Sequence, residues 1–249
     1  MTDVETTSRG PRSKQRRRAR PVDDSARAIS DEGGNMLFRA SPTVASAVRY
    51  LLARIQLNDA AGLPQRLAVT AALRGEGATF VSQAIAAVIA HDLNRRCCLV
   101  DLNWGHPTDY ASASRDSSGI ADVVNSGMSL DDVLVTTAEP NLMIMPAGIV
   151  PVSQRPVLAK SDRLAEVMDE LAEHFEHLIL DLPAVLATSD ALALALLCDA
   201  YALVVHQGVT TQDQVLDAFD ELRGVVSLGI ILNRDSTRIP KFLRRLVGV

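Results

Sequence analysis

The sequence predicts an α/β fold with a doubly wound, mostly parallel sheet and helices on both of its faces. From residue 67 onward, short apolar runs alternate with helical patterns. In a parallel sheet, the helices that connect the strands cover both faces of the sheet. Strands buried in this way are apolar along their whole length. The length of 249 residues, 47% of them hydrophobic, suits one large domain, alone or with a tail.

The elements follow in order from a first helix at residues 42–56, where Pro42 stands near the start and Val48, Leu52 and Ile55 keep helical spacing. Apolar runs predict strands at residues 67–72, 97–101, 142–145, 178–182, 200–206 and 225–232. Further helices are predicted at residues 79–94, 119–125, 162–174, 190–197, 211–223 and 240–247.

Residues 1–38 are predicted to form a disordered basic tail, and residues 39–249 the folded domain. The tail is polar and poor in large apolar residues, so it cannot bury enough surface to offset its ordering entropy. Residues 1–20 carry a net charge of +5, whereas the whole chain carries −5, which leaves −10 for the rest. Such a tail either stays solvated or contacts an anionic lipid surface or an acidic partner. An acidic body argues against general nucleic-acid binding, so no nucleic-acid partner is expected.

Cysteine content and hydropathy predict a cytoplasmic protein. Three cysteines, two of them adjacent in a predicted strand, indicate buried thiols in a reducing compartment. The N-terminus has no apolar signal core. The most apolar stretch, residues 184–205, is interrupted by Ser189, Asp190 and Asp199, which argues against a membrane span.

The segment LAVTAALRGEGAT at residues 67–79 has the layout of a phosphate-binding loop. That pattern ends in Gly-Lys-Ser/Thr, but Ala78 stands here between Gly77 and Thr79. Backbone amides in such a loop and the dipole of the following helix favour phosphate. The alternative is a glycine-bearing turn with a structural role only. On the first interpretation the loop would cradle phosphate without its lysine.

Polar side chains also end three predicted strands, at Asp101, Asp181 and Asn233. Ligands of open parallel sheets bind at the carboxyl ends of the strands. A carboxylate at the end of an apolar strand is suited to organising Mg²⁺, although helix capping or loop solvation would equally account for each acid alone. The Asn233 amide would read a nucleobase edge or simply cap the chain at the end of its strand.

Taken in order, these segments resemble the bacterial tyrosine kinase family, cytoplasmic ATPase-like domains that work with membrane polysaccharide co-polymerases. The family is part of the wider group of deviant P-loop ATPases. Its loop, roughly Ser-x-x-Pro-Gly-Glu-Gly-Lys-Ser/Thr, is echoed by AALRGEGAT at residues 71–79. Its motifs Val-Asp-x-Asp-x-Arg-x-Pro, Pro-Ala-Gly, Asp-x-Pro-Pro, Ser-Asp-Ala and Gly-Val-Val-Leu-Asn are echoed at residues 100–107, 146–148, 181–184, 189–191 and 229–233.

The resemblance covers roughly residues 40–235 and implies a P-loop NTPase-like fold for the domain. It implies ATP or ADP with Mg²⁺ as the ligand, the metal being organised by Thr79, Asp101 and Asp181. The phosphates would be held by the amides of Gly75, Glu76, Gly77, Ala78 and Thr79, and Asn233 would face the base. The implied partner is a membrane polysaccharide co-polymerase of the chain-length-determinant type, at the inner membrane, and an oligomer is compatible with the family.

The departures from the family concern charge. Ala78 replaces the loop lysine, Asn103 the second acid of the strand motif, and Gly105 its basic residue. Of the family's Glu-x-x-Arg-x-x-Arg helix motif only Arg49 remains, and the tyrosine-rich C-terminal tail is absent. Losing one charge-assisted contact costs about 1.5–3 kcal/mol, or roughly tenfold to a hundredfold in affinity. Binding survives such a loss, whereas phosphoryl transfer depends on charge neutralisation.

The sequence therefore predicts a catalytically silent kinase-like partner of a co-polymerase in capsule, exopolysaccharide or holdfast-type polysaccharide export. One alternative is an active ATPase or tyrosine kinase in which Arg74 substitutes for the lysine. Another is a positioning ATPase-like protein of the pilus-localisation or partition type. The predicted last helix, residues 240–247, is basic and amphipathic, and either packs on the domain or lies at a membrane surface.

Overall fold

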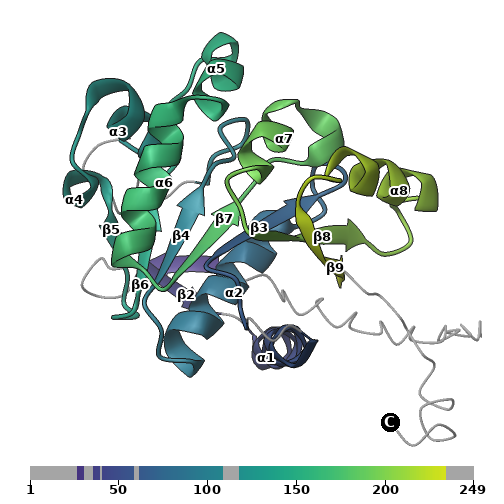
Figure 1. The fold of residues 1–249 in the computed structure, drawn as a ribbon. Coiled ribbons are helices and arrows are strands. Elements are labelled where there is room, and N and C mark those ends of the chain that lie inside the picture. Colours follow the sequence, from purple (N-terminus) through teal and green to yellow (C-terminus); the bar gives the residue numbers. More distant parts are fainter. Residues whose placement is uncertain (1–26, 31–35, 40, 59–61, 109–117, 234–249) are drawn as a thin grey trace, which may run out of the picture.

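The computed structural model describes residues 27–30, 36–39, 41–58, 62–108 and 118–233. Within these residues, seven strands form one sheet in the order β5-β6-β4-β7-β3-β8-β9 (Figure 1). The strands are β3 (Arg66–Ala71), β4 (Cys97–Asp101), β5 (Val135–Thr136), β6 (Leu142–Met145), β7 (His177–Asp181), β8 (Ala200–His206) and β9 (Val226–Asn233). All neighbours pair in parallel except β5, which runs antiparallel to β6.

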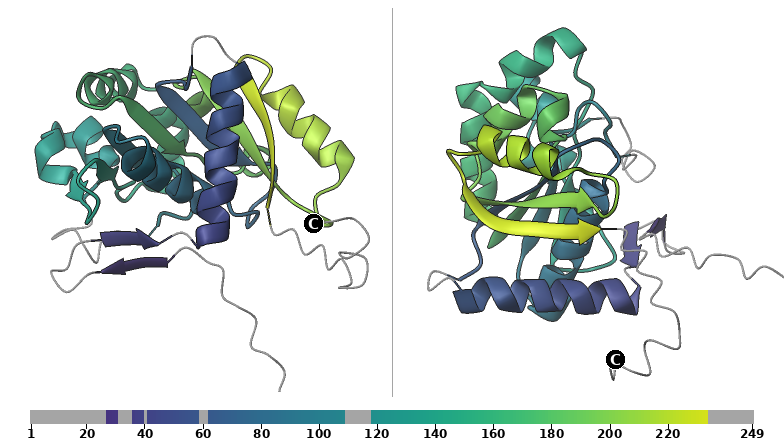
Figure 2. Two further views of the ribbon diagram at one scale, coloured as in Figure 1. Left: turned by 90° about the horizontal axis from the view of Figure 1, so that it is seen from below. Right: turned by 90° about the vertical axis from the view of Figure 1, so that its right-hand side faces the viewer.

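Helices cover both faces of this sheet, as the sequence predicts. They are α1 (Pro42–Asn58), α2 (Ala78–Asp92), α3 (Ile120–Ser126), α4 (Leu130–Val133), α5 (Arg155–Ala159), α6 (Asp162–His174), α7 (Asp190–Ala195) and α8 (Gln212–Glu221). Figure 2 shows α1 and α8 on opposite sides of the sheet. The fold is thus a doubly wound α/β fold.

The sheet separates two apolar cores. One lies under α1 and α2, where Leu52 and Ile89 pack with Leu67 of β3. The other lies under α3, α6, α7 and α8, where Leu164 and Leu194 pack with the strands' opposite face. Both cores consist mainly of buried aliphatic side chains. The two faces of the central strands are therefore apolar, which explains their nearly uninterrupted apolar sequence.

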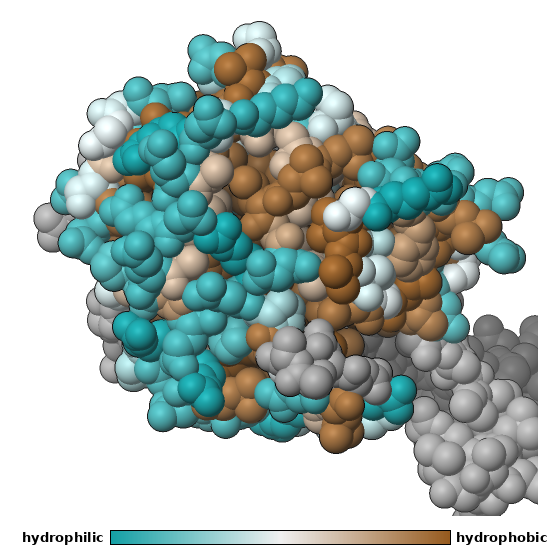
Figure 3. Space-filling model, viewed as in Figure 1, coloured by the Kyte–Doolittle hydropathy of each residue, from teal (hydrophilic) through white to brown (hydrophobic). Residues whose placement is uncertain are grey.

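The outer surface of the second helical layer carries apolar side chains, among them Leu196, directly after α7, and Leu216 of α8. Figure 3 shows apolar surface gathered on this side of the molecule, between the more polar regions. Contiguous exposed apolar surface is characteristic of interaction sites. No helix among the described residues is long and apolar enough to cross a membrane.

The structure departs from the sequence prediction mainly in short elements. The predicted strands and the long helices occur within one or two residues of their expected bounds, but β5, α4 and α5 were not predicted. These elements have two to five residues, too few for a periodic pattern to emerge.

Two antiparallel strands, β1 (Arg27–Ser30) and β2 (Met36–Arg39), fall in the range predicted to be a disordered tail. Met36, Leu37 and Phe38 give this segment an apolar content that the more basic residues before it lack. The basic residues 9–20 and the predicted helix at 240–247 lie outside the described residues. The domain boundary at residue 38 therefore stays a prediction.

Candidate functional site

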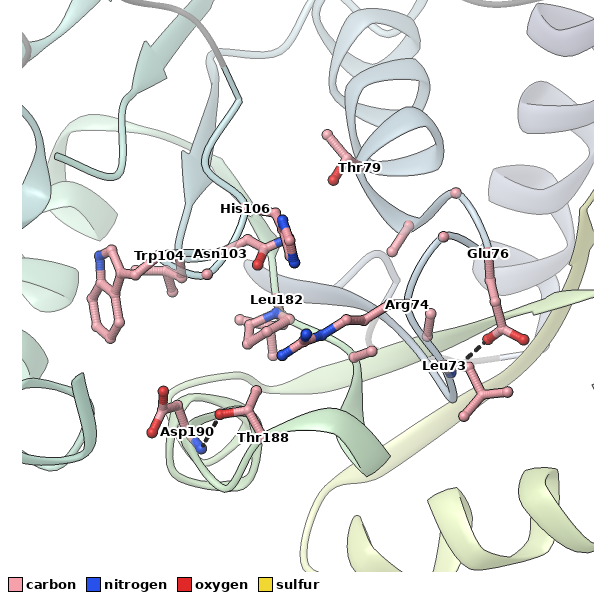
Figure 4. Close-up of a pocket in the computed structure, with 18 of the residues that line it drawn as sticks. Leu73, Arg74, Glu76, Thr79, Asn103, Trp104, His106, Leu182, Thr188 and Asp190 are labelled. Atoms are coloured by element: carbon pink, nitrogen blue, oxygen red, sulfur yellow. Dashed lines mark hydrogen bonds between the residues drawn. The ribbon is translucent and has the colours of Figure 1, made fainter. Parts of the chain in front are cut away.

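A cavity of about 600 Å³ opens at the carboxyl ends of β3, β4 and β7 (Figure 4). The loop after β3 forms one wall, and the segments after β4 and β7 form the others. Its charged and polar lining residues include Arg74, Glu76, Thr79, Asn103, His106, Arg155, Thr188 and Asp190. This is the crevice in which ligands of open α/β sheets bind.

The loop after β3 has the backbone shape of a phosphate cradle. Gly75 and Gly77 adopt left-handed conformations, with φ of 82° and 95°, which residues with a Cβ rarely adopt. Gly77 is also the N-cap of α2, so the unpaired amides of the first turn of that 15-residue helix face the cavity end of the sheet. Ala78, half-buried, packs against the apolar core under α1 and α2 and brings no charge.

Glu76 holds the loop from inside the protein. Its side chain is 3% exposed, and its Oε2 accepts a hydrogen bond of 2.9 Å from the backbone N–H of Leu73. The hydroxyl of Thr210 donates to Oε1. The sequence predicted Glu76 as part of the phosphate cradle through its amide, whereas the clamping role of its side chain was missed because Thr210 lies 134 residues away.

Asn233, predicted to face a nucleobase, lies at the end of β9 against this loop. Its Nδ2 donates a 2.8 Å hydrogen bond to the carbonyl oxygen of Glu76. A Cβ at Gly77 would lie 2.2 Å from the same nitrogen, so glycine is required there. Asn233 borders a groove between α1 and β9 and does not line the cavity itself. Its base-facing role therefore stays a prediction.

Asp101 and Asp181 meet behind the floor of the cavity. They are register partners on the neighbouring strands β4 and β7, and both are buried. Asp101 accepts hydrogen bonds from the backbone N–H groups of Asn103 (2.9 Å) and Thr108 (2.8 Å). Neither carboxylate oxygen of Asp181 has a hydrogen-bond partner among the described residues.

Burial raises the pKa values of both acids. Desolvation raises the pKa of Asp101 from 3.8 to about 6, against the lowering effect of its backbone hydrogen bonds. Desolvation, and then the charge of Asp101, raise the pKa of Asp181 well above its ordinary value. The nearby hydroxyls of Thr79 and Ser82 lower it in part, although neither completes a hydrogen bond to the carboxylate.

This arrangement suits a divalent cation. An unsatisfied buried carboxylate, a second carboxylate beside it and a threonine hydroxyl are oxygen ligands of the kind that Mg²⁺ prefers. Thr79, Asp101 and Asp181 were the residues predicted for the metal, and the structure brings them together. The described residues contain no cluster of three or more His, Cys, Asp or Glu side chains, so further ligands would come from a bound phosphate and water.

Arg155, Trp104 and Asp190 are among the cavity residues that were not predicted as part of the site. Arg155, from the unpredicted helix α5, lines the cavity beside Gly105 of the segment after β4. Trp104 donates from Nε1 to the carbonyl oxygen of Ala147 at 3.2 Å, which joins the segment after β4 to the one after β6. Asp190, at the start of α7, is 7% exposed. No local sequence signal marks Arg155, since its neighbours show no motif.

Known proteins resemble this chain in sequence. No protein-family model matches it. The tyrosine-protein kinase CpsD of Streptococcus agalactiae serotype Ia is 26% identical over 180 residues, which cover 71% of this chain and 77% of that protein. The tyrosine-protein kinase YwqD of Bacillus subtilis is 25% identical over 204 residues, covering 80% and 85%.

Solved structures resemble it in fold. The chimerical protein CapA2B2 superposes with a TM-score of 0.71 at 21% identity, covering 78% of this chain and 85% of that one. The kinase domain of the Escherichia coli tyrosine kinase ETK superposes with a TM-score of 0.67 at 26% identity, covering 76% of this chain and 74% of that one. The cell division ATPase MinD of Pyrococcus furiosus superposes with a TM-score of 0.57 at 21% identity, covering 75% of this chain and 81% of that one. By sequence and fold, the chain is a relative of the bacterial tyrosine-protein kinases of the P-loop type.

Proposed function

We propose that this protein is a nucleotide-binding but catalytically silent kinase-like partner of a membrane polysaccharide co-polymerase, acting in capsule, exopolysaccharide or holdfast-type polysaccharide export. The observation that carries the proposal is Ala78, a small apolar residue within an otherwise complete phosphate cradle. The loop's left-handed glycines, the Glu76 clamp and the buried acid pair are all present.

Retained nucleotide binding is supported by groups that do not depend on the lysine. The amides at the start of α2 and the helix dipole favour phosphate. The unsatisfied Asp181 carboxylate favours a bound cation. Loss of one charged contact weakens affinity by roughly tenfold to a hundredfold, which weakens binding without abolishing it.

Loss of catalysis follows from the same position. Phosphoryl transfer is accelerated mostly by positioning and charge neutralisation around the outer phosphates. At residue 78 the methyl side chain neither reaches a phosphate nor carries charge, and Asn103 takes the place of a second acid. A domain that binds nucleotide without hydrolysing it is suited to a stable regulatory or scaffolding contact.

The first alternative is an active ATPase or tyrosine kinase. Arg74 supports it, because this exposed side chain extends from the loop along the cavity toward Leu182 (Figure 4). The second alternative is a positioning ATPase of the MinD or partition type, for which the support is likeness of fold alone. The resemblance to tyrosine kinases in sequence favours the polysaccharide proposal over the second alternative.

The proposed place of action is the cytoplasmic face of the inner membrane, where the tail of a co-polymerase would contact the carboxyl edge of the sheet. The exposed side chains of Leu196, directly after α7, and Leu216 of α8 give the domain further apolar interaction surface. The basic residues 9–20 would add attraction to anionic lipid.

A genetic complementation experiment tests this proposal. Deletion of the gene should reduce polysaccharide secretion in the native cell. Ala78→Gly, which keeps the loop small and uncharged, should restore secretion, whereas folded Asp181→Arg should not, because it places a bulky charge beneath the cavity. Normal secretion in the deletion strain would contradict the polysaccharide role, and full rescue by folded Asp181→Arg would place the working surface elsewhere.

A further inference from the structure

The cavity that lacks a loop lysine has a second source of positive charge. Arg155, the first residue of α5, lines the cavity beside Gly105 of the segment after β4. None of the ion pairs formed among the described residues involves Arg155 or Arg74. Both guanidinium groups are therefore available to an anionic ligand.

The position of Arg155 is fixed by the backbone around it. Its Nε donates a 3.1 Å hydrogen bond to the carbonyl oxygen of Val150, and the side chain is half-buried. A Cβ on Gly105 would lie 3.6 Å from a terminal nitrogen of Arg155. The guanidinium group of Arg155 therefore lies next to Gly105, in the segment after β4. A larger side chain at residue 105 would occupy part of the same space.

Arg74 differs in how firmly it is held. Its side chain is exposed and makes no hydrogen bond among the described residues. Ordering a free arginine side chain on a ligand costs up to about 2 kcal/mol of rotamer entropy. Arg155 has already lost part of that freedom through its bond to Val150, so it is the better prepared of the two to bind an anion.

The strand order places Gly105, beside which Arg155 lies, on the opposite side of the phosphate loop from Asn233. In the sheet, β4 lies two positions to one side of β3, whereas β9 lies two positions to the other. The phosphate loop follows β3, between them. A nucleotide whose base lies toward β9 would extend its outer phosphates toward β4, and so toward Gly105 and Arg155.

We propose that Arg155 is the cation that binds the outer phosphates of a nucleoside di- or triphosphate in this cavity, supplied by α5 where the loop and the β4 motif have lost theirs. The inference rests on the proposed nucleotide site and names the residue that makes it effective. The planar guanidinium presents paired N–H donors that match phosphate oxygens. The contact is one of binding, and no bond of the nucleotide is broken.

The test is calorimetric titration of the purified full chain with MgADP, MgATP and AMP. Arg155→Ala should lower the affinity for MgADP and MgATP by about tenfold to a hundredfold. It should lower the affinity for AMP by less than threefold, because AMP lacks the outer phosphates. Arg163→Ala removes an exposed arginine of α6 whose ion pair among the described residues is with Glu166, and it should leave all three affinities unchanged. A purely structural role for Arg155 would weaken AMP and MgADP alike, which would overturn the proposal.

Gly105→Arg in the Arg155→Ala background supplies a second arm. Gly105 has no positive φ, and a Cβ there meets only ordinary contacts, so the backbone accepts a side chain. The double variant should recover most of the lost MgADP affinity. Arg155→Gln takes the place of Arg155→Ala if the alanine variant melts at a lower temperature than the unchanged protein.

The outcomes separate the two proposals. MgADP binding by the unchanged protein with equal binding by Arg155→Ala would overturn the role of Arg155 and leave the nucleotide site standing. Failure of the unchanged protein to bind either MgADP or MgATP would overturn both. A selective loss with Arg155→Ala that Gly105→Arg repairs supports both.

Discussion

Asp101 and Asp181 are direct register partners on β4 and β7, and their carboxylates are buried together with Asp181 making no hydrogen bond among the described residues. Two adjacent buried carboxylates repel each other when both are ionised. The pair is therefore costly to the protein alone and becomes favourable when a cation or a proton lies with it. A functional demand on the site explains why the sheet retains it.

The acid pair predicts an unusual pH dependence of stability. Because folding raises the pKa of Asp101 from 3.8 to about 6 and that of Asp181 in the same direction, the folded state binds more protons than the unfolded state above pH 3.8. The pair's contribution to the free energy of unfolding should thus fall as pH rises from about 4 through 6 and beyond. Denaturant unfolding in EDTA at pH 5 and pH 7.5 measures this change in the free energy of unfolding.

Asp181→Asn isolates this effect. At pH 7.5 without metal, the variant should be more stable than the unchanged protein, because it removes the carboxylate whose charged form is disfavoured by burial and by the charge of Asp101. Its stability should also vary less between pH 5 and pH 7.5. Glu170→Gln, which neutralises an exposed carboxylate on α6, is the matched control and should change little. A variant less stable than the unchanged protein at both pH values would contradict the account.

The Glu76 clamp predicts a stability effect centred on the loop. Glu76→Ala leaves the Leu73 N–H and the Thr210 hydroxyl without their shared acceptor, so the free energy of unfolding should fall by roughly 1–3 kcal/mol. Glu166→Ala removes an exposed glutamate paired with Arg163 and should cost less than about 0.5 kcal/mol. Equal effects of the two substitutions in chemical denaturation would show that the clamp does not hold the loop.

Alanine substitutions at Gly77 and Gly75, in the same loop, are expected to differ in their effect on stability. Both have positive φ, so alanine is strained at each, but only at Gly77 would the new Cβ meet Asn233. Gly77→Ala should therefore destabilise the protein by about 1 kcal/mol more than Gly75→Ala, because it also disrupts the bond from Asn233 to Glu76. In an Asn233→Ala background the two should become equal. A difference that persists there would assign the effect to something other than Asn233.

The sequence predicted the central sheet well, because strands such as β4 and β8 are short apolar runs with clear ends at Asp101 and His206. The sequence also predicted that Asp101 and Asp181 lie at the same edge of the sheet, because the carboxyl ends of parallel strands lie together. Those inferences depend on local patterns and on the geometry of a parallel sheet, which hold for the whole fold class.

The rest of the site depends on contacts distant in sequence. Arg155 enters the cavity from a five-residue helix that has no periodic pattern, and its partner Gly105 lies 50 residues earlier. The clamp between Glu76 and Thr210 joins the segments after β3 and β8, which are 134 residues apart in the chain. Asn233 was correctly expected at the end of its strand, but its bond to Glu76 follows from the register of β9 with β8, which no single segment specifies.

Burial predicts that Tyr201 is not a phosphorylation site. Tyr201 is 1% exposed within β8 and lies beside Phe219, with ring centroids 6.2 Å apart. A kinase would reach its hydroxyl only after local unfolding of a central strand. Tyr50, by contrast, is 68% exposed on α1, so it is the accessible control, and Tyr110 lies outside the described residues.

Mass spectrometry of protein purified from its native cell checks this. No phosphotyrosine is expected at Tyr201, nor at Tyr50, because the proposed silent domain does not phosphorylate itself. Stoichiometric modification of Tyr50 would indicate a kinase acting on this chain, and modification of Tyr201 in folded protein would contradict the position of β8.

The central claim is that the loop binds nucleotide without transferring its phosphate, and steady-state ATP turnover of the purified protein with Mg²⁺ tests it most directly. With Ala78 in the loop, phosphate release should equal that of a reaction without protein. Turnover near ~1 s⁻¹ or above, an ordinary enzymatic rate, would contradict the claim. If Arg74→Ala abolished that turnover, the active alternative with Arg74 as the substituting cation would take its place.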